Sequence, residues 1–180
     1  NFKISYFDRV GNSPEPWFWK AQDLLEAAKT LRKNCPIFKV KREDIGSVFL
    51  KRPRVNRFKH FGVMMMLRAM AIECILKGLW AKAGGKLTQD GKLVRIPNTG
   101  DHDLISLANA IAKKTTLKFS CEEKQFLKRL SVAIVEERYP LPTKAAKHEI
   151  WGWGYPVDDD KFESIMSKLR PLLKKRKQEN

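Results

Sequence analysis

Cysteine is scarce in this chain: Cys35, Cys74 and Cys121 are the only three in 180 residues, and none belongs to a C-x-x-C pair. An odd number of widely spaced cysteines indicates neither a disulfide framework nor a zinc-binding motif. It fits a reducing compartment, so we expect a cytoplasmic protein. The sequence also lacks P-loop, G-x-G-x-x-G, G-x-S-x-G and H-E-x-x-H patterns, which removes the enzyme classes that these motifs identify. We therefore expect neither a metal nor a cofactor.

Long apolar runs are missing as well. The most apolar stretch, from Phe61 to Trp80, is interrupted by Arg68, Glu73 and Lys77, and each of these would be costly at the centre of a bilayer. The stretch predicts a buried helix, and we expect no membrane association. Residues 1–18 contain prolines and charges but no continuous apolar segment, so they predict no signal peptide.

Acidic residues are few compared with basic ones. The chain has 36 Lys and Arg but 20 Asp and Glu, a formal net charge of +16. Such a field recruits polyanions, because each phosphate that a protein neutralises releases counterions from the nucleic acid. We expect a nucleic-acid partner, RNA first. An acidic protein partner and a merely solvated basic surface remain the alternatives.

The basic residues gather in two segments. Residues 168–177 carry six cations, and residues 51–59 carry five cations and no acid. The second segment supplies most of the candidate nucleic-acid-binding residues, namely Lys51, Arg52, Arg54, Arg57 and Lys59.

Helix signals recur along the chain. A proline after an oxygen-bearing residue opens a helix at Ser13, and the capping box from Ser120 to Glu123 opens another. Apolar periodicity and turn residues predict helices from about 13 to 33, 60 to 83, 101 onwards, 120 to 139 and 158 to 177. The Asp90-Gly91 pair suits a tight turn and predicts a small β-hairpin over residues 86–94. We expect an all-α, up-and-down bundle of four to five long helices in one domain over residues 1–180.

Two polar clusters stand out within the expected helices. Glu73 and Lys77 lie four residues apart in the most apolar helix, which fits both a structural ion pair and a charged pair kept for a ligand. His102 lies between Asp101 and Asp103 at a helix start. This position fits both local capping and an imidazole oriented for chemistry.

Three other features have two interpretations each. Arg138 near the end of the fourth helix suits the helix dipole and also suits phosphate. The aromatic loop 151–156 precedes a basic helix up to residue 177, and it fits a staple on the bundle end or a base-stacking platform. Met64, Met65 and Met66 cover three helix faces, so part of this run belongs to the core and part is available to a second subunit.

Four short motifs resemble, in their order, the HEPN superfamily: Trp19-Lys20-Ala21-x-x-Leu24-Leu25-x-Ala27-Ala28, Ala71-Ile72-Glu73-x-x-Leu76-Lys77, His102-Asp103-Leu104-x-x-Leu107 and Arg138-Tyr139-Pro140. The HEPN-like core would span about residues 14–142. The resemblance implies a helical bundle that forms a homodimer. It also implies a role as a metal-independent endoribonuclease in toxin–antitoxin or phage-defence systems, or as an inactive relative that binds RNA or nucleotides.

Active members of that family carry an Arg followed, after four to six residues, by a His in a late helix. Here Arg138 is followed by His148 with nine residues between them, and the matching spacing from Arg95 to His102 lies outside the late helix, as does that from Arg54 to His60. The motif is therefore degenerate or rearranged, and enzymatic activity stays an open question.

The resulting expectation is an RNA-binding protein, with a non-catalytic module that docks an acidic protein as the alternative. The candidate catalytic residues are His102, Arg138 and Glu73, and the candidate nucleic-acid-binding residues add Lys77 and Asp103 to the basic segment.

Overall fold

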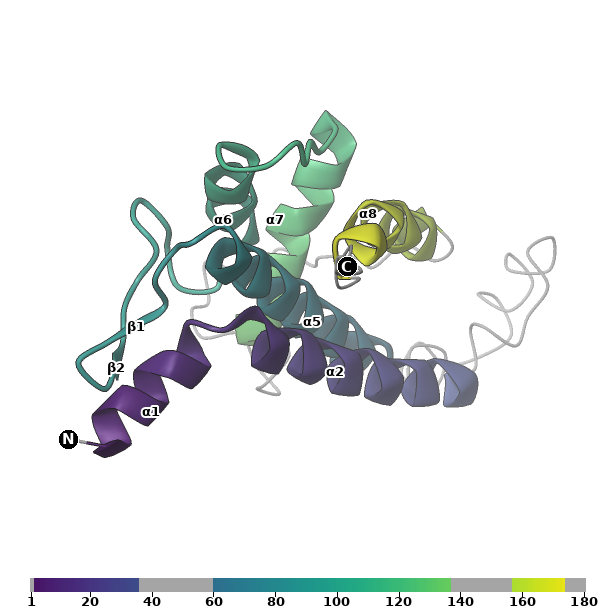
Figure 1. Cartoon of the computed structure of the whole chain (residues 1–180). Helices are drawn as coiled ribbons and strands as arrows, with labels where there is room; N and C mark the ends of the chain where they lie inside the picture. The colour runs from purple at the N-terminus through teal and green to yellow at the C-terminus, as the bar shows by residue number, and fades with distance from the viewer. Residues whose placement is uncertain (1, 36–59, 137–156, 174–180) are drawn as a thin grey trace, which may run out of the picture.

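The computed structural model describes residues 2–35, 60–136 and 157–173 of the chain (Figure 1). Six helices and one two-stranded sheet make up this part. The elements in chain order are α1 (Phe2–Gly11), α2 (Pro14–Asn34), α5 (Phe61–Lys82), β1 (Thr88–Gln89), β2 (Lys92–Leu93), α6 (Leu104–Ala112), α7 (Cys121–Glu136) and α8 (Val157–Leu173). The predicted all-α fold with a small β-hairpin is confirmed.

Helix α5 lies at the centre of the described structure. It contacts α2, α6, α7 and α8 (Figure 1), and more than half of its residues are buried. This explains why its sequence is apolar around most of its circumference, since a helix with neighbours on several sides leaves little surface to solvent. Met64 and Met65 are fully buried, whereas Met66 is only partly buried.

Helices α2 and α5 run side by side (Figure 1). The predicted stripe of α2 is confirmed, because Ala21, Leu24 and Ala28 are buried at helical spacing. Gly78 of α5 makes the close approach feasible: a Cβ at this position would lie 2.7 Å from Cδ1 of Phe18. The ring of Phe18 thus occupies the space that a side chain at position 78 would need.

Helix α1 is an element that the sequence did not predict. None of its residues is buried, and its apolar side chains Phe2, Ile4, Tyr6 and Phe7 are exposed. It is tied to the hairpin instead. The Asn12 side chain, just after α1, accepts hydrogen bonds from the backbone N–H groups of Leu87 and Thr88 and donates one to the Thr88 carbonyl. The Asp8 carboxylate accepts another from the Gly91 N–H.

The predicted hairpin turn is also confirmed. Thr88 pairs with Leu93 and Gln89 pairs with Lys92, which leaves Asp90 and Gly91 as the two turn residues. Both have positive φ, 54° and 75°, the conformation that a two-residue turn needs to match the twist of its strands.

Two helix starts can be compared with their prediction from the sequence. The Ser120–Glu123 capping box is confirmed, because the Ser120 hydroxyl accepts from the Glu123 N–H and the Glu123 carboxylate accepts from the Ser120 N–H. The third helix begins at Leu104 and not at Asp101. Its N-cap is Asp103, whose Oδ1 accepts hydrogen bonds from the N–H groups of residues 105 and 106.

The acidic start of α8 does more than complement the helix dipole. Asp159 pairs with the buried Arg68 of α5 at 2.7 Å and with Arg32 of α2 at 2.8 Å. Asp158 pairs with Arg129 of α7. These ion pairs fix α8 against three other helices.

Candidate functional site

A cleft of about 390 Å³ opens beside the C-terminal half of α5. Its walls are α5, the start of α2, the segment from β2 to residue 96 and the loop that leads into α6. The wall residues include Trp17, Glu73, Lys77, Arg95, His102 and Asp103. The structure therefore brings four of the predicted site residues, Glu73, Lys77, His102 and Asp103, to one place.

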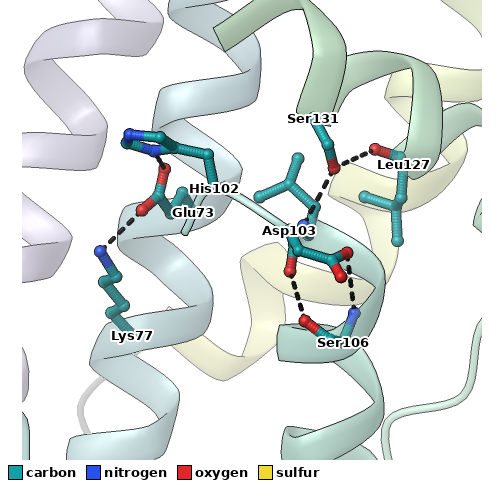
Figure 2. A network of polar contacts seen from close by, with 8 residues as sticks. Glu73, Lys77, His102, Asp103, Ser106, Leu127 and Ser131 are labelled. Carbon is teal, nitrogen blue, oxygen red and sulfur yellow. Dashed lines mark hydrogen bonds and ion pairs between the residues drawn. The ribbon is translucent and has the colours of Figure 1, made fainter. Parts of the chain in front are cut away.

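Glu73 is the centre of the polar contacts in this cleft. Its Oε1 accepts a hydrogen bond from Lys77 Nζ at 2.6 Å, and its Oε2 lies 2.9 Å from His102 Nδ1 (Figure 2). The Glu73 side chain is only 9% exposed, whereas those of Lys77 and His102 are 32% and 36% exposed. A buried carboxylate is thus held between two groups that remain open to the cleft.

These two partners keep Glu73 ionised. Burial opposes the charge and acts to raise the pKa of the carboxyl group, but the hydrogen bonds with His102 and Lys77 outweigh it and hold the pKa of Glu73 below its usual value. Next to an ionised carboxylate, Nδ1 of His102 carries its hydrogen and donates it. In the neutral ring, Nε2 is then the atom that can accept a proton.

The backbone at His102 is unusual for a residue with a side chain. Its φ is 58°, in the left-handed region, which costs roughly 1–2 kcal/mol for a residue other than glycine. The next residue, Asp103, returns to an extended conformation as the N-cap of α6. This reversal sends the two neighbouring side chains in different directions, as Figure 2 shows: the imidazole lies against Glu73, while the Asp103 carboxylate lies over its own helix.

The loop behind His102 is held firmly. The Asp103 carboxylate caps α6, and the Ser106 hydroxyl donates to the Asp103 carbonyl at 3.1 Å. The Leu104 N–H donates to the hydroxyl of Ser131 in α7, which itself donates to the Leu127 carbonyl (Figure 2). Asp103 is thus engaged in capping, and this network sets the position from which His102 reaches α5.

Trp17 and Arg95 lie in the cleft wall although sequence reasoning did not assign them to the site. Trp17 carries no signal apart from the α2 stripe. Its Nε1 donates to the Gly11 carbonyl at 2.8 Å, and Lys77 Nζ lies 5.5 Å from the centre of its ring. Arg95 pairs with Asp101 at 2.8 Å in an exposed position. The spacing from Arg95 to His102 was the available signal for that residue.

Cys74, next to Glu73, is excluded as a nucleophile. Burial raises the pKa of its thiol to about 11, and the Glu73 carboxylate adds to the rise. The thiol therefore stays protonated near neutral pH, where the thiolate is the reactive form.

The remaining site predictions fall on other parts of the chain. Arg138, the basic segment 51–59 with its five candidate residues, the aromatic loop 151–156 and the basic residues 174–177 lie outside the described residues. Among the residues that are described, no group of three or more His, Cys, Asp or Glu is placed to hold a metal ion. No helix of the described ranges has the length and apolarity needed to cross a membrane.

Comparisons with protein-family models, with curated proteins and with solved structures return no match for this chain. The resemblance to the HEPN superfamily therefore rests on the four sequence motifs, and function has to be argued from the cleft and the charge.

Proposed function

We propose that this protein binds RNA and that the cleft around His102 is where the RNA is engaged. The observation that carries the proposal is the His102–Glu73–Lys77 arrangement. The backbone of His102 has a left-handed conformation, and its imidazole contacts the buried Glu73 carboxylate. The side chains of His102 and Lys77 both line the cleft. Strain of this kind, held in place by surrounding structure, is concentrated at functional sites.

The net charge of +16 supports a polyanionic partner. A positive field attracts nucleic acid over long distances, and the gain from counterion release grows with each phosphate contacted. The basic segment 51–59 is the proposed backbone contact. The order of HEPN-like motifs supports RNA over DNA and a homodimer, and toxin–antitoxin or phage-defence systems are the setting that it suggests.

The same three side chains could supply metal-independent cleavage. Nε2 of His102 would accept the proton of a ribose 2′-hydroxyl, whose oxygen then attacks the adjacent phosphorus. The 5′-oxygen would leave with a proton from water, which gives a 2′,3′-cyclic phosphate. Glu73 would stabilise the imidazolium formed in this step, and Lys77, which pairs with Glu73, would keep that carboxylate ionised. Binding is the core of the proposal, and cleavage is its extension.

A gel-shift titration tests binding. The whole chain is titrated with a single-stranded RNA and with a duplex DNA at low and at higher salt. We expect RNA to bind more tightly than DNA and the affinity to fall steeply with salt. Absence of RNA binding at low salt refutes the proposal and favours a module that docks an acidic protein.

A pair of histidine variants tests the site. His60 also has positive φ, 69°, and is exposed at the start of α5, outside the residues that line the cleft. We expect His102→Ala to weaken RNA binding and to remove any cleavage measured in a chelator, while His60→Ala leaves both unchanged. Equal effects of the two variants would place the binding site elsewhere.

A further inference from the structure

The cleft has no excess of positive charge. Among the residues that line it, two cations, Lys77 and Arg95, face three carboxylates, Glu73, Asp101 and Asp103. Each carboxylate is also matched: Glu73 by Lys77 and His102, Asp101 by Arg95, and Asp103 by the N–H groups of α6. A phosphate group would gain little inside this space, although the chain as a whole carries a charge of +16.

Another part of the cleft lining is apolar. It is formed by side chains of the hairpin, the segment that follows it and α6, namely Leu87, Leu93, Val94, Ile96 and Leu107. Leu93 is 70% exposed, a large apolar side chain left open to solvent. The Trp17 indole adds a rigid ring, since its N–H is already bonded to a carbonyl. The cleft lining therefore combines apolar side chains with polar groups that are already paired with one another.

We infer that this cleft takes a single unpaired nucleobase, with its ribose, of the bound RNA, while the phosphates stay outside on the basic surface. The inference rests on the proposed function and adds which part of the RNA the cleft recognises. A base offers an apolar face and a polar edge, and ligand sites of roughly 300–1,000 Å³ hold molecules of this size. Only an unpaired base can enter, because a paired base is stacked within the helix.

Three RNAs test the inference in wild-type protein. One is a duplex with a single bulged nucleotide, the second has an abasic site in place of the bulge, and the third is fully paired. The first two carry the same number of phosphates. We expect the bulged duplex to bind at least about fivefold more tightly than the abasic one, with an equal dependence on salt, because a base contact releases no counterions.

A variant that fills the cleft tests the location. Val94→Trp should reduce the affinity for the bulged duplex to that for the abasic duplex and leave the salt dependence unchanged. Val63→Trp is the matched control, since Val63 is an exposed residue of α5 that does not line the cleft. It should bind like the wild type.

The outcomes separate the inference from the proposed function. If none of the three RNAs binds, both fail. If all three bind equally, RNA binding stands and the inference about the unpaired base is wrong. If the bulged duplex is preferred and Val94→Trp keeps that preference, the base binds outside this cleft and the inference is equally wrong. Should Val94→Trp not fold, the comparison of the bulged and abasic duplexes in the wild type still decides the matter.

Discussion

Replacing His102 by glycine and by alanine separates two effects on stability: the strain of its left-handed backbone and the contact made by its side chain. Both substitutions remove the contact with Glu73, a hydrogen bond to a charged group with a partly exposed donor. Because the imidazole is more than one third exposed, we expect this loss to be about 1 kcal/mol, below the range for buried charged groups. The left-handed φ of 58° remains in the alanine variant.

Glycine removes the strain as well. Relief of the left-handed strain raises the free energy of unfolding by roughly 1–2 kcal/mol. The greater conformational freedom of glycine in the unfolded chain lowers it by about 0.4–1 kcal/mol. We therefore expect His102→Gly to be more stable than His102→Ala by about 0.5–1 kcal/mol. The glycine variant should lie close to the wild type.

Urea unfolding followed by circular dichroism measures the two free energies, and equal m-values show that both variants unfold from comparable states. The paired substitutions at His60, which also has positive φ, provide a second measurement of left-handed strain without the Glu73 contact. A glycine variant at position 102 that is no more stable than the alanine variant would refute the argument that strain is stored there.

Three further outcomes follow from the fold. Asn12→Ala should destabilise the protein by roughly 2–3 kcal/mol, because three hydrogen bonds to the hairpin are lost. Asn34→Ala is the control, since it loses one exposed hydrogen bond and should change the stability little. Hydrogen exchange in residues 87–94 should become faster in Asn12→Ala alone. Gly78→Ala should destabilise by about 1 kcal/mol in thermal melts, because overpacking exceeds the helix-propensity gain of alanine; a rise in melting temperature would contradict the close packing at this position. Burial acts to raise the pKa of Glu73 and that of Asp159, but hydrogen bonds outweigh it and hold both pKa values below the usual value; the partners are His102 and Lys77 for Glu73, and Arg32 and Arg68 for Asp159. The stability contributed by the two carboxylates is complete above the ordinary carboxyl range and is lost as the pH falls through the lowered pKa values. Urea midpoints should therefore be flat near neutrality and drop on acidification, and the drop should be smaller in Glu73→Gln.

Local signals in the sequence predicted the parts of the fold that depend on neighbours along the chain. The Ser120–Glu123 capping box and the Asp90-Gly91 turn each act within four residues, so their chemistry is legible without tertiary structure. The pairing of Glu73 with Lys77 belongs to the same class, since residues four apart share a helix face. These features are confirmed.

The features that sequence reasoning missed depend on contacts between distant segments. Helix α1 buries no residue of its own and owes its place to hydrogen bonds with the hairpin, about eighty positions later. The contact of His102 with Glu73 joins residues 29 positions apart and needs a left-handed backbone that no spacing rule indicates. Glu73, Lys77, His102 and Asp103 line one cleft, and their spacing along the chain does not indicate this; Arg138 lies outside the described residues.

The Asn12 side chain makes the hydrogen bonds with β1 that a neighbouring strand would make. In this hairpin the N–H and C=O of Thr88 face away from β2, and the amide of Asn12 meets both of them, one as acceptor and one as donor. An amide group offers the same two polar atoms as a peptide bond, so the side chain acts as a one-residue substitute for a third strand. The outer edge of β1 is thereby closed to strand addition from another chain, which is the usual route by which a short exposed hairpin promotes aggregation.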